Sequence, residues 1–199
     1  MRRTLAFLSL ATLFAAPAFA QQAALDRQDQ NFLNEAAILN LSELQMAKLA
    51  QERAETPELK RFVDRLIQDH GKAMERLQGT AQGLDFRLPQ EVDAPTKARL
   101  DDIANSAAAF DRRFMAEQED AHARAIKLFE AQAQSNGHPA VRQYAESALP
   151  DLRAHLEAAR SLSDLMAQGP QTQAPGYGTS QPPAGPDGTG SSTADPAKP

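Results

Sequence analysis

Apolar residues recur every three or four positions over four long segments of this chain, the spacing that places them on one face of a helix. No segment shows the sustained alternation that is typical of a half-buried β-strand. The four apolar faces extend over residues 32–50, 59–81, 111–129 and 141–166. The pattern therefore predicts an all-α fold.

The breaks between these segments predict how the helices are connected. Thr56-Pro57 marks the end of the first long helix and the start of the second. Asn136-Gly137 marks the end of the third long helix, directly before the fourth. Residues 84–106 form a longer connection with a short amphipathic piece at about 96–103. Two tight turns and one long connection predict an antiparallel four-helix bundle with a short helical crossover insert.

Three local features carry further predictions. Asn105-Ser106 is expected to cap the third long helix, because such side chains accept hydrogen bonds from free N–H groups. Pro150 lies inside the fourth segment, where it lacks an N–H group, so we expect a kink there or two shorter helices. His138 precedes Pro139 at a turn and is expected to be an exposed capping residue without another role.

The first twenty residues have the features of an export signal. Arg2 and Arg3 precede an apolar run over residues 5–16, and Ala18-Phe19-Ala20 matches the small-x-small pattern of a cleavage site. The run is too short to span a bilayer, and nothing downstream resembles a stop-transfer segment. No cysteine follows it, which excludes a lipid-anchored lipoprotein. We predict a cleaved signal peptide at 1–20 and a periplasmic or secreted protein without an integral membrane segment after cleavage.

The composition changes again near the other end of the chain. Residues 168–199 hold seven of the thirteen prolines and six of the ten glycines, mixed with Ser, Thr and Gln. Such a segment buries too little apolar area to offset its conformational entropy. We therefore predict a disordered tail at 168–199 and one folded helical domain at 25–167.

Charge and cysteine content exclude several classes of function. Without Arg2 and Arg3, 19 basic residues face 26 acidic ones, a formal net charge of about −7, which disfavours nucleic acid and anionic membranes as partners. The absence of cysteine removes disulfides, thiolate metal ligands and cysteine nucleophiles. The sequence also lacks a Gly-x-Ser-x-Gly elbow and a phosphate-binding loop.

Four polar residues interrupt the apolar faces, one on each predicted helix: Glu43, His70, His122 and His155. Glu43 and His70 are equally distant from the first tight turn, and His122 and His155 from the second. His70 and His122 are also equally distant from the middle of the connection at 84–106. If all these helices are antiparallel neighbours, the four side chains share one layer of the bundle.

Such a layer has two interpretations. Three imidazoles and a carboxylate are suitable ligands for one transition metal ion such as Zn, Fe, Mn or Cu. Nearby carboxylates would then orient the histidines, and the candidates are Asp69, Glu119 and Asp151. Alternatively, the layer is a buried Glu–His hydrogen-bond network that fixes the register of the helices and binds no metal.

Four blocks of the sequence carry a resemblance to a known family. They read FVDRLIQDH at 62–70, AFDRRF at 109–114, DAH at 120–122 and LPDLRAHL at 149–156. In this order they resemble the bacterial domain-of-unknown-function family 4142, over residues 29–165. The resemblance implies a ferritin-like four-helix fold in an exported, often envelope-located protein, and no established reaction.

The resemblance also bears on the number of metal ions. The wider ferritin-like group often holds two metals through a Glu on two helices and Glu-x-x-His on the other two. Here only Glu119 and His122 fit that motif, because Ile67 and Leu152 stand at the corresponding positions before His70 and His155. A single metal, or none, is more consistent with these residues.

Three functions therefore remain open. The first is an exported ferritin-like bundle that binds a metal or acts in stress. The second is a structural or interaction protein whose acidic surface and tail engage envelope proteins. The third is a metal-dependent redox enzyme, against which the missing second ligand set counts; the sequence does not define an oligomeric state.

The export signal gives the first testable prediction. Cleavage after Ala20 should leave Gln21 as the first residue of the protein recovered from the bacterial periplasm, and intact-mass analysis should show it. A mass that still includes residues 1–20 would contradict this assignment.

Overall fold

The computed structural model describes residues 24–106 and 109–168. Within them lie five helices: α1 (Arg27–Arg53), α2 (Pro57–Gly83), α3 (Ala94–Ala104), α4 (Phe110–Ala133) and α5 (Pro139–Gln168). The predicted signal peptide and residues 169–199 of the predicted tail lie outside the described residues. Of the helices in these two ranges, none combines the length and the apolar character that a membrane crossing requires.

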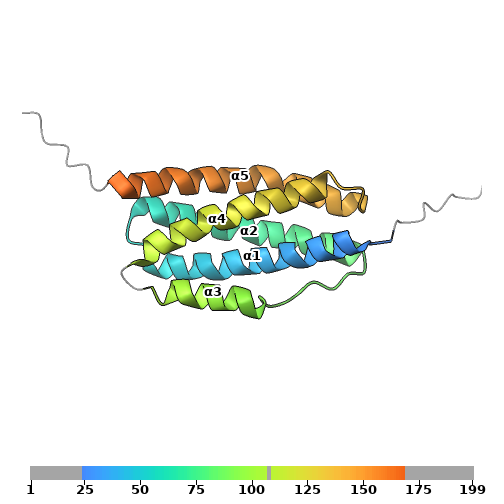
Figure 1. The fold of residues 1–199 in the computed structure, drawn as a ribbon, viewed down its shortest axis with the longest axis horizontal. Helices are drawn as coiled ribbons and strands as arrows, with labels where there is room; N and C mark the ends of the chain where they lie inside the picture. The colour runs from blue at the N-terminus through green and yellow to red at the C-terminus, as the bar shows by residue number, and fades with distance from the viewer. Residues whose placement is uncertain (1–23, 107–108, 169–199) are drawn as a thin grey trace, which may run out of the picture.

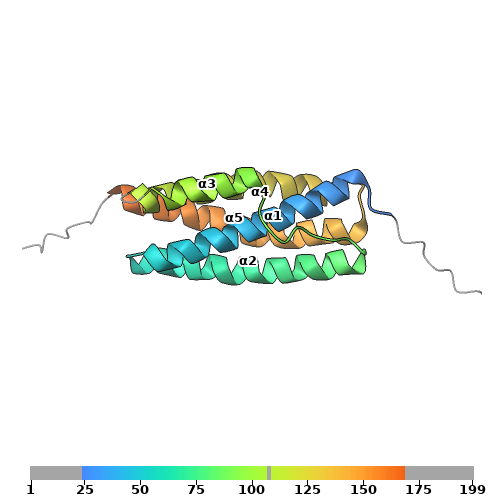
Figure 2. The ribbon, with the colours of Figure 1, turned by 90° about the horizontal axis from the view of Figure 1, so that it is seen from below.

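The four long helices form the bundle shown in Figure 1. Helix α1 packs against α2 and α4, and α5 packs against the same two helices. Each of these neighbouring pairs runs antiparallel. The short helix α3 covers α1 and α4 from outside, on the way from α2 to α4 (Figure 2). The all-α, antiparallel four-helix bundle with a helical crossover is therefore confirmed.

One step of the layer prediction is wrong. Helices α2 and α4 are diagonal in the bundle and run in the same direction, because the crossover returns the chain to the end at which α2 began (Figure 1). Equal distance from the connection therefore does not set the levels of His70 and His122. Their common level arises instead through α5, which is an antiparallel neighbour of both helices.

The helix ends agree with the sequence signals in part. Thr56 caps α2, with its hydroxyl accepting a hydrogen bond from the N–H of Leu59. The cap predicted for the third long helix at Asn105-Ser106 is wrong. The Ser106 hydroxyl donates to the carbonyl group of Ile103 and so closes α3, whereas α4 begins at Phe110 without a side-chain cap.

Helix α5 continues through Pro150, so a division into two helices is wrong. Pro150 is exposed, and so is Glu146, whose carbonyl group would have accepted the missing N–H. Water can hydrate a carbonyl group on that side of the helix, which lowers the cost of the proline.

The apolar core is divided into two parts by a polar layer. One cluster includes Phe32, Leu77 and Phe129, and the other includes Val63 and Phe114. In each long helix, the residues of the polar layer stand between the residues of one cluster and the residues of the other. All of them are buried: Asn40, Glu43, His70, Gln118, His122 and His155. Two tightly packed apolar regions therefore hold the layer in place from both sides.

A buried carboxylate joins the start of α1 to the turn between α4 and α5. Asp29, 1% exposed, accepts hydrogen bonds from the side-chain amide of Gln132 at 2.7 Å and from the N–H of His138 at 2.8 Å. His138 caps α5 as predicted, because its Nδ1 accepts from the N–H of Ala140. It is nevertheless buried, so its predicted exposure is wrong: the contact with Asp29 draws the turn onto α1.

This carboxylate makes Gly137 sensitive to substitution. A Cβ atom at residue 137 would lie 2.2 Å from Oδ1 of Asp29. Gly137→Ala must displace a buried carboxylate from its two donors, and we expect a loss of roughly 1–3 kcal/mol in the free energy of unfolding. Urea denaturation measures it.

Gly79→Ala is the matched control, because a Cβ atom there, four residues before the end of α2, meets nothing within 4 Å. It should stabilise the protein by up to about 1 kcal/mol. Equal stability of Gly137→Ala and the unmodified protein would mean that the contact with Asp29 relaxes without cost.

Candidate metal centre

Three of the four long helices each contribute one histidine to the centre of the polar layer. His70 comes from α2, His122 from α4 and His155 from α5, and their side chains are at most 2% exposed. The ring centroids form a nearly equilateral triangle with sides of 5.5, 5.3 and 5.2 Å. The structure thus brings together the three histidines that the sequence singled out.

One nitrogen of each ring faces the other two rings. Nε2 of His70 lies 3.4 Å from Nε2 of His122, which lies 3.3 Å from Nδ1 of His155. One ligand atom from each histidine lies within 4.8 Å of the other two. Within 24–106 and 109–168, this is the one group of His, Asp and Glu side chains that converges in this way.

The outward nitrogen of each ring contacts an oxygen atom that accepts a hydrogen bond. Nδ1 of His122 donates to the backbone carbonyl of Gln118 at 2.9 Å, four residues earlier in α4. Nε2 of His155 donates to Oδ2 of Asp69 at 3.0 Å, across the interface of α5 and α2. Because these oxygens only accept, both outward nitrogens carry the proton.

His70 is held in the same way by an amide. Its Nδ1 lies 3.0 Å from Oδ1 of Asn40, on α1. The amide nitrogen of Asn40 donates to the carbonyl group of Ala36 at 2.8 Å, which fixes the orientation of the amide and leaves its oxygen to accept from His70. The hydroxyl of Tyr144 accepts a second hydrogen bond from the same amide nitrogen.

The three inward nitrogens consequently present lone pairs to one another. A neutral imidazole has one donor and one acceptor nitrogen, and here the donor is already used on the outside of each ring. Three acceptors that face each other cannot form hydrogen bonds among themselves, and their dipoles repel. A cation at the centre would turn this repulsion into attraction.

The spacing of the nitrogens fits a metal ion. Zinc binds imidazole nitrogen at about 2.0–2.1 Å, and two such bonds at a tetrahedral angle separate their nitrogens by about 3.3–3.4 Å. The two shortest separations in the centre, 3.3 and 3.4 Å, have this length. The donor set of three neutral imidazoles therefore fits one transition metal ion.

Burial favours the neutral forms of His70 and His155. It lowers the pKa of His70 well below its ordinary value, and the neighbouring rings of His122 and His155 lower this pKa further, because a positive charge on His70 would be repelled by a positive charge on either of them. Burial also lowers the pKa of His155, although the hydrogen bond to Asp69 works in the opposite direction. Partial burial works to raise the pKa of Asp69, but the hydrogen bonds from His155 and Arg65 outweigh it and lower the pKa. His70 and His155 are thus neutral beside one ionised carboxylate.

Glu43, the fourth residue expected at this level, is buried in the layer at 4% exposure but lies outside the converging group. Its carboxylate accepts a hydrogen bond at 2.8 Å from the side-chain amide of Gln118. It therefore pairs with a neutral amide in this structure, and the Glu–His contact assumed for the network interpretation is absent from the described hydrogen bonds.

Of the three acidic residues expected to orient the histidines, Asp69 does so. The carboxylate of Glu119 accepts instead from the hydroxyl of Ser163 on α5, and Asp151 forms an ion pair with Arg76 at 3.8 Å. Both are turned toward neighbouring helices, since the backbone carbonyl of Gln118 and the carboxylate of Asp69 already occupy the outward nitrogens of His122 and His155.

Sequence reasoning missed Asn40 and Gln118. Both are polar residues on core-facing positions, and Gln118 precedes His122 by four residues, which is the spacing at which a helix brings a carbonyl group beside a side chain. Asn40 precedes Glu43 by three residues, on the same face of α1. A search for amides within one turn of the four polar residues would have found both.

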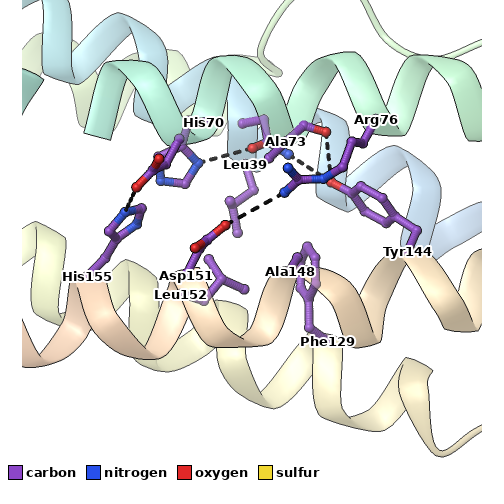
Figure 3. A pocket seen from close by; sticks show the side chains of 12 residues that line it. Leu39, His70, Ala73, Arg76, Phe129, Tyr144, Ala148, Asp151, Leu152 and His155 are labelled. Atoms are coloured by element: carbon purple, nitrogen blue, oxygen red, sulfur yellow. Dashed lines mark hydrogen bonds and ion pairs between the residues drawn. The ribbon is translucent and has the colours of Figure 1, made fainter. Parts of the chain in front are cut away.

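A narrow cavity of about 10 Å³ borders His70 and His155, between α2 and α5 (Figure 3). Figure 3 shows the ion pair of Arg76 and Asp151 at one side of it and the hydroxyl of Tyr144 near the carbonyl group of Ala73. Burial raises the pKa of Tyr144 to about 12, so the phenol stays protonated. The cavity volume is at the lower limit for one water molecule.

Comparisons with known proteins support the fold. Residues 14–162 match the sequence profile of DUF4142, described as a domain of unknown function. No curated protein matches the sequence.

Solved structures with the same fold include a DUF305 fragment from Deinococcus radiodurans. It is 10% identical, has a TM-score of 0.63, and the match covers 72% of this chain and 99% of the fragment. CopM in its Cu(I)-bound form is 19% identical with a TM-score of 0.59, over 69% of this chain and 96% of CopM. The Cu(II)-bound form of CopM is 19% identical with a TM-score of 0.58, over 69% of this chain and 97% of CopM. At these identities the likeness shows the fold alone.

Proposed function

This chain belongs to DUF4142, a family described as a domain of unknown function, and we propose that it binds one transition metal ion through His70, His122 and His155. The observation that carries the proposal is the set of inward lone pairs. Each histidine is oriented from outside by an acceptor, so that the nitrogen facing the centre is free to bind a cation. Hydrogen bonds of this kind normally accompany histidine ligands in metal sites.

Copper is the metal that the surroundings favour for the first test. Imidazole nitrogen suits Cu, Zn, Fe and Ni better than it suits Mn, and the chain has no thiolate that would direct the choice. CopM, which shares the fold, is known in Cu(I)-bound and Cu(II)-bound forms. The likeness motivates the choice of copper, and the ligands are argued from this chain alone.

Export is part of the proposal. The basic start, apolar run and Ala18-Phe19-Ala20 pattern favour release into the periplasm or outside the cell, where the bundle would meet metal ions beyond the cytoplasm. One set of three ligands is a binding site for a single ion, so the proposed role is binding or sequestration of metal. No redox reaction is proposed.

The proposal predicts one bound metal ion per chain. Metal-free protein offered copper, zinc, Fe(II) or Mn(II) in turn should retain about one equivalent of the preferred metal after desalting, measured by elemental analysis. Free metal at a hundred times the Kd should raise the free energy of unfolding by about 2.7 kcal/mol, because only the folded protein holds the three ligands together. His122→Ala should abolish both effects.

His138→Asn is the matched control. It changes the one histidine outside the centre and keeps a side-chain acceptor for the N–H of Ala140. Circular dichroism should show that both variants fold. If His122→Ala does not fold, His155→Gln takes its place in the experiment. If the unmodified protein binds none of the four metals more tightly than about 10 μM, equivalent to about 7 kcal/mol, the layer is a hydrogen-bond network and the proposal fails.

A further inference from the structure

We propose that the centre selects a monovalent ion, Cu(I), over divalent ions, because only one carboxylate contacts its three ligands and that carboxylate is shared with an arginine. The inference rests on the proposed metal binding and adds the charge of the ion that is bound. It follows from the residues that surround the histidines and from the burial of the site.

The ligands and most of their partners are neutral. An imidazole binds a metal ion in its neutral form, and two of the three outward acceptors are an amide oxygen of Asn40 and a backbone carbonyl of Gln118. Asp69 supplies the single carboxylate that contacts a ligand. The other buried carboxylate of the layer, Glu43, is engaged with the side-chain amide of Gln118 and lies outside the converging group.

The charge of Asp69 is itself shared. Nε of Arg65 lies 3.3 Å from Oδ2 of Asp69, the same oxygen that accepts from His155. At the ligands themselves, a monovalent ion would therefore meet one partly neutralised carboxylate. A divalent ion would need a second carboxylate in contact with a ligand, and Glu43, which pairs with Gln118, makes no such contact, so the charge of a divalent ion would be less well balanced at the site.

Burial makes that imbalance costly. The three histidines are at most 2% exposed and lie between two apolar clusters. The cost of transferring an ion from water into such surroundings grows with the square of its charge, so that a divalent ion loses about four times as much solvation as a monovalent one of the same size. The attraction between a metal ion and neutral ligands offsets less of this lost solvation free energy than attraction to carboxylates would.

The number of ligands favours the same ion. Zinc in proteins is almost always four-coordinate, and this group offers three nitrogens. The adjoining cavity of about 10 Å³ is at the lower limit for a water molecule that could serve as the fourth ligand. Cu(I) is a d¹⁰ ion that three nitrogen donors suffice to bind, so it requires no ligand from solvent.

The first experiment measures the preference in the unmodified protein. Under anaerobic conditions, competition with a colorimetric chelator gives the Kd for Cu(I), and competition with divalent chelators gives those for Cu(II) and Zn(II). We expect Cu(I) to bind at least about a hundredfold more tightly than Cu(II). At 59 mV per tenfold for a one-electron couple, this raises the reduction potential of bound copper by about 120 mV relative to free copper.

Charge variants around Asp69 test the cause. Asp69→Asn keeps an acceptor for His155 and removes the charge, so binding of Cu(II) and Zn(II) should weaken about tenfold more than binding of Cu(I), because the Coulomb energy scales with the charge of the ion. Arg65→Gln, an exposed change, should shift the ratio in the opposite direction by freeing the carboxylate.

Arg61→Gln is the matched control. Arg61 lies one turn earlier in α2 and pairs with Glu58 at the surface, so its removal changes the net charge by the same amount without touching the centre. The ratio of the Cu(I) and Cu(II) affinities should remain at the value of the unmodified protein.

The outcomes separate the two proposals. If the unmodified protein binds no metal, the proposed function fails. If it binds metal but holds Cu(II) or Zn(II) as tightly as Cu(I), charge selection is wrong although the site exists. If Asp69→Asn weakens all ions by one factor and Arg65→Gln leaves the ratio unchanged, Asp69 only orients His155, and the inference is overturned.

Discussion

The geometry of the histidine centre depends above all on the hydrogen bonds that orient the three buried imidazoles from outside. Each ring donates one hydrogen bond outward: His70 to Asn40, His122 to the carbonyl group of Gln118, and His155 to Asp69. The remaining nitrogens therefore face one another at the centre with their lone pairs. Without a cation this arrangement is repulsive, and a bundle selected for stability alone would place apolar side chains there. The proposed metal ion would remove this repulsion.

The rest of the bundle supplies the rigidity that this arrangement needs. Apolar clusters on both sides of the layer confine the rings, and the carboxylate of Asp29 ties the α4–α5 turn to the start of α1. The crossover with α3 makes α2 and α4 parallel and diagonal (Figure 1), while α5 lies beside both. This topology allows histidines from three helices to reach one point on the axis of the bundle.

The sequence predicted the fold and the three histidines, since both depend on helical spacing, which is a local property. The predictions were wrong where a side chain can form its hydrogen bond with partners on more than one helix. Glu43 has the position of a ligand but turns to the amide of Gln118, and His138 is buried because Asp29 binds its N–H. Such choices depend on the packing of neighbouring helices, which the spacing of residues along one helix does not specify.

The proposed metal binding requires that the inward nitrogens carry no proton, and nitrogen-15 NMR of the imidazoles in metal-free protein at neutral pH measures where the protons lie. We expect His70 and His122 to be protonated at Nδ1 and His155 at Nε2, in agreement with their outward acceptors. A proton on Nε2 of His122, donated to Nδ1 of His155, would mean that the rings satisfy one another's hydrogen bonds, and no set of three inward lone pairs would then exist.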